Sequence, residues 1–319
     1  MRSLVSGGAG FIGSNLVDAL VERGDSVLVL DDLSSGRREN LDDALGRGAR
    51  LAEGSMTDAE FVQSSVTAFR PESVFHLAAQ VDVRKAVADP VFDATVNLLG
   101  TINLLEAVKE AGGAPLVFTS TGGAIYGEGE GRDLPFTEAA AAEPEAPYGA
   151  SKLGCEVYLG LYRRLYRLPA LALRLGNVYG PRQDPAGEAG VVAIFCGRLR
   201  EGRALEVFGD GMQTRDYVFV GDVVRALVAS GAALSERGVE LNGPYNIGTG
   251  VETTVVELSE LLGRAAGVEA TVHHQPERPG EVSRAVIDAA AAARDLSWRP
   301  MIDLAGGLAT TYEWLAESA

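Results

Sequence analysis

Tyr148 and Lys152 lie four positions apart in the segment PYGASKLGCEVY, residues 147–158. Apolar residues recur at every fourth position in this part of the chain and predict a helix, in the row Leu153, Val157, Leu161 and Leu165. Because positions i and i+4 share one helix face, the phenol and the ammonium project from the same side. Lysine occurs only at positions 85, 109 and 152, and unlike arginine it has a pKa that burial shifts readily. The pair is either a surface contact or a general base beside a cation.

The bulk composition limits the classes of function. The chain has 319 residues, enough for one large domain or two coupled domains. Its hydrophobic content of 46% and charged content of 23% are typical of a soluble globular protein. The net charge of −16 argues against a nucleic acid or an anionic membrane surface as the partner.

The metal-ligating and thiol residues are few. Cys155 and Cys196 are far apart in sequence and do not form a disulfide framework, and the three histidines do not suggest a metal site. We therefore expect no metal, two buried reduced thiols and a cytoplasmic protein. We also expect no targeting segment and no apolar run of the roughly 18 residues that a membrane span needs.

The first 36 residues predict a strand, a glycine-rich turn, a helix and a second strand. Gly7, Gly10 and Gly13 lie between the first strand and the helix, where glycines allow a sharp turn and a close approach to a pyrophosphate. Asp31 ends the second strand, where an acid can accept hydrogen bonds from an adenosine ribose diol. This acid would repel a 2′-phosphate, so NAD is favoured over NADP. The alternative rests on Arg37 and Arg38, which could reach such a phosphate from the following loop.

Alternation of strands and helices continues along the chain. Residues 73–79, 115–120 and 169–177 read as strands, and residues 93–112 as a helix. This pattern predicts an α/β fold with a doubly wound, Rossmann-like parallel sheet. We expect an NAD-binding domain at 1–176 and a smaller substrate domain at 177–319. Segments near 216–230 and 244–250 are expected to return to the first domain.

Several motifs together resemble one family over nearly the whole chain. They are SGGAGFIGSNL, FHLAAQ, VNLLGTINLLEA, STGGAIYG, YGASK, LRLGNVYGPRQ, FGDGMQTRDYVFVGDV, YNIGTG and RPGEV, in that order. The chain resembles extended short-chain dehydrogenases/reductases, and within them the UDP-glucose 4-epimerases. The resemblance implies Tyr148 and Lys152 as the catalytic pair and Thr121 as the hydroxyl that binds the reacting sugar oxygen. The usual hydroxyl position holds Gly122, so we infer a one-residue insertion, with Ser120 as the alternative.

The resemblance also implies binding residues. The expected NAD-binding residues are Gly7, Gly10, Phe11, Ile12, Gly13, Asp31, Asp32, Ser35, Gly36, Ser55, Met56, Leu77, Ala78, Ala79, Thr119, Tyr148, Lys152 and Leu175. Ser55 and Met56 replace an Asp-Ile pair of many relatives. The expected substrate-binding residues are Ser120, Thr121, Asn177, Val192, Phe208, Arg215, Arg278 and Glu281. Arginine suits a diphosphate through its forked donors, and Phe208 could stack on uracil.

The implied chemistry explains the Tyr-Lys pair. Free tyrosine has a pKa of about 10, and nearby cations lower it. Lys152 and the positive nicotinamide ring would make Tyr148 a base for the sugar 4-hydroxyl. Hydride would pass from C4 to NAD+, the 4-keto sugar would turn about its diphosphate, and hydride would return to the other face.

Other readings stay open. A 4,6-dehydratase usually carries Asp-Glu after the Thr, where this chain has Gly122 and Gly123. A UDP-glucuronate epimerase often has Arg at the position of Asp184, and a small residue such as Ala285 would leave room for UDP-GlcNAc or UDP-GalNAc. A non-catalytic NAD sensor would be expected to lack the Tyr or the Lys.

Helices 93–112 and 149–167 pair with their copies in relatives, which implies a homodimer.

Overall fold

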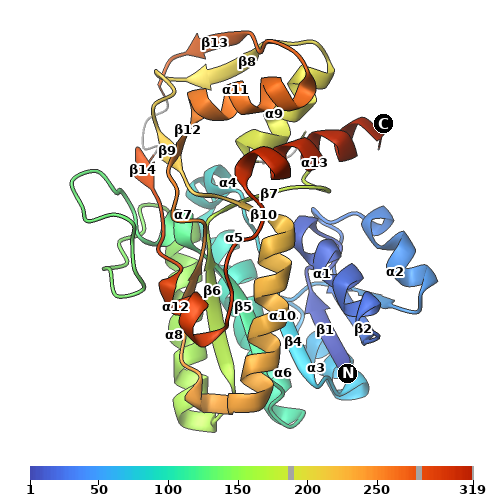
Figure 1. Ribbon diagram of the computed structural model, residues 1–319. Coiled ribbons are helices and arrows are strands. Elements are labelled where there is room, and N and C mark those ends of the chain that lie inside the picture. The colour runs from blue at the N-terminus through green and yellow to red at the C-terminus, as the bar shows by residue number, and fades with distance from the viewer. Residues whose placement is uncertain (186–189, 278–281, 318–319) are drawn as a thin grey trace.

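The computed structural model describes residues 1–185, 190–277 and 282–317 (Figure 1). Seven strands form a parallel sheet in the order β11-β6-β5-β4-β1-β2-β3. Their bounds are β1 Arg2–Ser6, β2 Ser26–Asp31, β3 Arg50–Glu53, β4 Ser73–His76, β5 Leu116–Thr121, β6 Ala170–Leu175 and β11 Tyr245–Ile247. The predicted Rossmann-like α/β class is confirmed.

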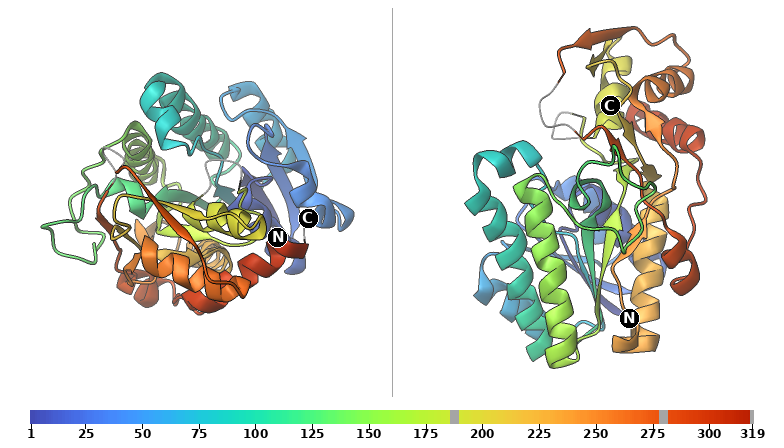
Figure 2. Two further views of the ribbon diagram at one scale, coloured as in Figure 1. Left: turned by 90° about the horizontal axis from the view of Figure 1, so that it is seen from above. Right: turned by 90° about the vertical axis from the view of Figure 1, so that its left-hand side faces the viewer.

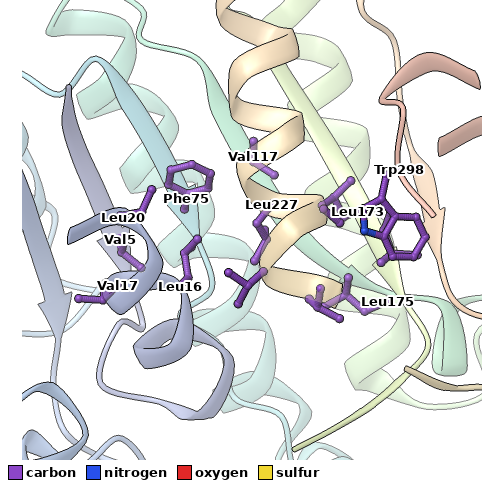
Figure 3. Close-up of a cluster of buried hydrophobic side chains, with 14 of the residues drawn as sticks. Val5, Leu16, Val17, Leu20, Phe75, Val117, Leu173, Leu175, Leu227 and Trp298 are labelled. Atoms are coloured by element: carbon purple, nitrogen blue, oxygen red, sulfur yellow. The ribbon is translucent and has the colours of Figure 1, made fainter. Parts of the chain in front are cut away.

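Both faces of this sheet are covered by helices (Figure 2). One face carries α3 Ala59–Phe69, α6 Gly100–Glu110 and α8 Pro147–Tyr166, and the other carries α1 Phe11–Glu22 and α10 Val220–Arg237. Alternate residues of a strand pack on opposite faces of the sheet. Val117 packs with α1 and α10, while Leu116 and Phe118 pack with α6 and α8. Figure 3 shows the hydrophobic cluster on the face of α1 and α10, which includes Trp298. Burial on both faces explains the continuous apolar runs of the strands.

The smaller layer above the sheet comes from the C-terminal half. It contains α9 Val191–Arg200, α11 Val255–Ala266 and α13 Leu304–Glu317, packed with the parallel pair β8 Leu205–Phe208 and β13 Val272–Gln275. Short strands join it to the sheet: β7 Asn177–Tyr179 pairs with β10 Tyr217–Phe219, and β9 Thr214–Arg215 lies between β12 Thr253–Thr254 and β14 Arg284–Ala285. The predicted domain limits at 176 and 177 stay a prediction, while α10 and β11 belong to the sheet layers.

The predicted helix at 93–112 has an interruption. It consists of the end of α5 Pro90–Ala94, a π-helical turn at Thr95–Leu99 and α6. By length and composition alone, Pro90–Glu110 could cross a membrane, contrary to our expectation that no segment could. Since 44% of its apolar window is buried inside the protein, and core helices pass the same test, this is weak evidence for a membrane span.

Candidate active site

The glycine turn between β1 and α1 is built for close backbone contacts. A Cβ on Gly13 would lie 2.0 Å from the carbonyl oxygen of Gly7, and a Cβ on Gly7 would lie 2.5 Å from the nitrogen of Ala78. Gly7 also has a φ of +70°, which favours glycine. Gly10 caps α1 without a side-chain hydrogen bond, so the first amides of the helix, from Phe11 and Ile12, remain available to an anion. This arrangement fits a dinucleotide pyrophosphate.

Asp31 holds the turn to the end of β2. Its Oδ2 accepts from the amide of Ala9 at 2.9 Å, and its Oδ1 accepts from the amide of Leu33 at 2.9 Å. Burial, with a smaller contribution from Asp32, raises the pKa of Asp31 above its ordinary value, against the effect of these hydrogen bonds. Each oxygen keeps a second acceptor position, which fits a ribose diol.

The other expected cofactor residues line the carboxyl ends of successive strands. Asp32, Ser35 and Gly36 follow β2, Ser55 and Met56 follow β3, Leu77, Ala78 and Ala79 follow β4, Thr119 lies near the end of β5, and Leu175 ends β6. This edge is where parallel sheets bind nucleotides. The side chain of Met56 is buried in the cluster of α3 and α6, and its expected adenine contact stays a prediction.

Tyr148 and Lys152, the predicted catalytic pair, lie on α8 as the spacing predicts. Lys152 is buried, its Nζ donates to the carbonyl of Thr119 at 2.9 Å, and it lies 4.6 Å from the ring centroid of Phe118. The same nitrogen is 6.0 Å from the ring centroid of Tyr148. The residues used to predict the helix are on its other side, since Val157, Leu161 and Leu165 are exposed.

The electrostatics of the pair differ from the expectation. Burial raises the pKa of Tyr148, and the nearby Asp93 and Cys155 raise it further, so the protein's own groups do not lower it as we predicted. Burial lowers the pKa of Lys152 to about 8, against the opposing effect of Cys155, Asp93 and Glu156. The motif identifies Lys152, but local sequence does not reveal that the buried Asp93 lies near this pair.

A cavity of about 300 Å³ opens beside Tyr148. Four of the expected substrate residues line it: Thr121, Asn177, Val192 and Arg215. Thr121 caps the short helix α7 Gly122–Ile125, because its Oγ1 accepts from the amide of Ala124 at 3.1 Å. Its hydroxyl hydrogen can still be donated into the cavity.

Ser120 points into a different environment. Its hydroxyl donates to Oε1 of Glu156 at 2.5 Å, and Glu156 forms a buried ion pair with Arg174. Arg174 also donates to the hydroxyl of Tyr126, which donates to Oδ1 of Asn246. Ser120 is not among the cavity residues, so this geometry favours Thr121 over Ser120 as the hydroxyl near the substrate.

Phe208 is the remaining expected substrate residue that the structure describes. It ends β8 and does not line the cavity. Arg278 and Glu281 lie outside the described residues. Arg215 lines the cavity, while the neighbouring Asp216 accepts from the amides of Thr249 and Gly250, so its carboxylate is used to hold that turn.

Sequence reasoning missed Gln183. It lines the cavity, its Nε2 donates to the carbonyl of Val178 at 3.2 Å, and its buried Oε1 has no hydrogen-bond partner among the described residues. It lies in the motif LRLGNVYGPRQ, so the motif could have indicated it. Tyr179 and Tyr217, also missed, line the same cavity. No group of three or more possible metal ligands occurs in the part of the chain that the structure describes.

Comparison with known proteins identifies the family. Residues 4–311 match the family model described as GDP-mannose 4,6 dehydratase. The chain belongs to this family of NAD-dependent epimerases and dehydratases. It is 46% identical to a UDP-glucose 4-epimerase of Mycolicibacterium smegmatis, over 98% of both chains. These matches confirm the family resemblance that the motifs indicated.

Two solved structures are similar throughout. The UDP-glucose 4-epimerase of Thermotoga maritima with UDP-glucose has a TM-score of 0.92 and 43% identity, covering 100% of this chain and 99% of that one. The UDP-glucose 4-epimerase of Thermus thermophilus with NAD has a TM-score of 0.89 and 42% identity, covering all of both chains.

Proposed function

We propose that this protein is an NAD-dependent 4-epimerase of a UDP-hexose that interconverts UDP-glucose and UDP-galactose. The observation that carries the proposal is the cavity in which Tyr148 and Thr121 meet Asn177 and Arg215, beside the dinucleotide cradle. Relatives at 46% and 41% identity are named UDP-glucose 4-epimerase and putative UDP-glucose 4-epimerase, which supports this substrate class.

Tyr148 is the base in the proposed reaction. NAD, held by the turn at Gly7–Gly13 and by Asp31, supplies the hydride acceptor and donor when bound. Tyr148 removes the proton of the sugar 4-hydroxyl and later returns it, while Thr121 orients the 4-oxygen. Asn177 and Arg215 hold the UDP part, so binding energy comes from a region remote from the reacting carbon. The 4-keto sugar turns about the diphosphate between the two proton transfers.

The closest rival reaction does not suit the site. A Cβ on Gly122 would lie 2.7 Å from Cδ1 of Ile287, and one on Gly123 would lie 3.2 Å from Oδ1 of Asn177. An Asp-Glu pair of the dehydratase type would therefore require the surroundings to move. This crowding supports epimerisation over dehydration.

The test is C4 inversion followed by proton NMR. Purified protein is incubated separately with UDP-glucose, UDP-GlcNAc and UDP-glucuronate, first without and then with added NAD. We expect inversion of UDP-glucose. Turnover of only another sugar would correct the substrate, and no turnover of any of the three would favour the sensor. Ala285 is buried in β14 and does not line the cavity, so it does not support the N-acetyl sugars.

We also propose a homodimer in the cytoplasm. Exposed apolar side chains cover neighbouring helices: Val91, Phe92 and Leu99 on the segment 90–99, and Val157, Leu161 and Leu165 on α8. A second copy would bury this face. Light scattering during gel filtration should give the mass of two chains, and Val157→Glu with Leu161→Glu should give one. Both cysteines are free and buried, as predicted, which supports a reducing compartment.

A further inference from the structure

Asp93 is a buried carboxylate immediately behind the catalytic helix. It has no exposed surface, and its Oδ1 accepts from Nε2 of Gln80 at 3.0 Å and from Nδ2 of Asn97 at 3.1 Å. Its Oδ2 is buried without a hydrogen-bond partner among the described residues. A buried carboxylate with one unsatisfied oxygen is costly unless a positive charge compensates it.

A chain of hydrogen bonds connects Asp93 to the turn that carries Tyr148. Asn97, in the π-helical turn, donates to the hydroxyl of Ser151 at 3.2 Å. Ser151 donates to the carbonyl of Tyr148 at 3.0 Å. The same Asn97 exchanges hydrogen bonds with the backbone of Gln80 at 2.8 and 3.0 Å. The carboxylate is therefore fixed relative to the catalytic helix.

The other buried charges of the described chain already have partners. Arg174 pairs with Glu156, and Asp222 pairs with Arg225. Asp31 and Asp216 accept from backbone amides. Lys152 is the exception among the cations, because its ammonium is buried and the hydrogen bond found for it goes to a neutral carbonyl. Among the described residues, Asp93 is thus a buried anion with one oxygen that lacks a hydrogen-bond partner, and Lys152 is a buried cation without an ion-pair partner. Asp93 lies on α5, which packs against α8, the helix that carries Lys152.

We propose that Asp93 is a positioning residue whose carboxylate is the through-space counter-charge of the catalytic Lys152. It stabilises the ammonium without touching it, and it opposes formation of a phenolate at Tyr148 until a second positive charge is present. The inference rests on the proposed function only where it calls Tyr148 and Lys152 catalytic. The effect of Asp93 on the protonation of Lys152 can be measured without any substrate turnover.

The remaining titratable groups around the pair do not provide this charge. His76 on β4 is buried, and burial together with Lys152 lowers its pKa to about 3, so it is neutral near pH 7. Burial raises the pKa of Cys155 on α8, which keeps it a thiol. Glu156 is held by Arg174. The facing residues of β5 are Phe118, Thr119 and Thr121, which do not titrate. Arg84 and Lys85 lie on α4 Val83–Ala88, and Arg215, Tyr179 and Tyr217 lie across the cavity.

The direct test is the titration of Lys152 by NMR in Asp93→Asn. With lysine labelled by 13C at Cε, the protein gives three signals, from Lys85, Lys109 and Lys152, and Lys152→Met assigns the third. We expect the midpoint of Lys152 to fall by about 0.5 to 1 pH unit in Asp93→Asn, because a nearby anion favours the charged form. If the protein is an epimerase, both limbs of its pH–rate profile should also move to lower pH.

Asp89→Asn is the matched control. Asp89 is exposed on the same helix, where it caps α5 by accepting from the amide of Phe92, and asparagine caps equally well. Its loss removes the same charge from a solvated position, where screening is strong. An unchanged Lys152 midpoint in Asp93→Asn, or an equal shift in Asp89→Asn, would overturn the proposal. Failure of the epimerase assay with a shifted midpoint would overturn only the proposed function.

A stability cycle covers the case in which Asp93→Asn folds but is too unstable for the titration. Asp93→Asn, Lys152→Met and the double variant are compared by urea unfolding. We expect the double variant to be more stable than the sum of the single losses predicts, because it removes both buried charges. Additive losses, or a double variant that does not fold, would show that the carboxylate is needed independently of Lys152 and would overturn the counter-charge role.

Discussion

Arg37 and Asp184 form an ion pair between the loop after β2 and the loop after β7. Arg37 is the residue that could have offered a positive charge to a 2′-phosphate, and Asp184 occupies the place of an arginine in some relatives. The pair therefore joins two features that the sequence presented as separate alternatives. It also ties the loop that carries Gln183 to the adenosine side of the cofactor cradle, together with the ion pair of Arg182 and Asp18.

Release of this ion pair should alter the cofactor preference. In Asp184→Ala, Arg37 loses its partner and can turn toward a 2′-phosphate, so the affinity for NADP should rise by up to roughly tenfold. NAD should still bind more tightly, since Asp31 remains. Isothermal titration of both cofactors measures the ratio. The control is the double variant Arg37→Ala, Asp184→Ala, which should lose the gain; a gain that persists would assign it to another residue.

Tyr148→Phe should lower the rate of epimerisation by a factor of at least about 10³, because it removes the proton acceptor and donor. Binding of the UDP-sugar should change little, since Asn177 and Arg215 are untouched. Proton NMR gives the rate and fluorescence or calorimetry gives the affinity. Retention of most of the rate would remove Tyr148 from its proposed role.

The rate should fall as the pH rises through about 8, where Lys152 loses its proton. The folded-state pKa lies below the ordinary value of 10.5, so between these values the unfolded chain binds more protons than the folded one. The contribution of Lys152 to the free energy of unfolding therefore increases across pH 8 to 10.5, while the activity decreases. A pH–rate profile and urea unfolding at matched pH values test this. A decline in rate that follows loss of folded protein would contradict it.

The buried pair of Arg174 and Glu156 should be important for stability. Arg174→Met leaves Glu156 as a buried charge and should lower the free energy of unfolding by about 3–5 kcal/mol. The matched control is Arg198→Met, whose partner Glu206 is 42% exposed, and which should cost no more than about 1 kcal/mol. Urea unfolding compares the two. Equal losses would show that burial does not distinguish these pairs.

Gly13→Ala should prevent formation of the cofactor turn. The added carbon would lie 2.0 Å from a backbone oxygen, which cannot move as a flexible side chain would. We expect loss of NAD binding and a lower melting temperature. Gly46→Ala is the control, because a Cβ there meets no atom within 4 Å and alanine favours the helix. Normal NAD binding by Gly13→Ala would refute the proposed close packing.

The sheet and the glycine-rich turn after β1 could be predicted from the sequence because both depend on local patterns. Buried runs such as 26–31 and the glycines at 7, 10 and 13 have one dominant structural solution. The helix at 147–166 was also predicted, but from the wrong face: Val157 and Leu165 are exposed, and the buried side carries polar residues such as Ser151 and Lys152. A periodic row shows that a helix exists, not which neighbour covers that row.

Long-range contacts explain what could not be predicted. The choice between Thr121 and Ser120 depends on Glu156, which lies 36 positions after Ser120 and binds it. Burial raises the pKa of Tyr148, and Asp93, which lies on a different helix, raises it further. Met56, which stands at an expected cofactor position, packs against α6, because Gly100 leaves space for it. None of these neighbours can be identified from local spacing.

The outermost position of β11 has a consequence for synthesis of the chain. This strand lies next to β6, although about 70 residues of other structure separate them in sequence. Until residue 247 leaves the ribosome, β6 is an open sheet edge and its apolar side chains Leu173 and Leu175 lack one neighbour. A nascent chain that stops near residue 176 would expose this edge to association with other chains. The nucleotide-binding layers therefore complete their folding only after most of the polypeptide has been made.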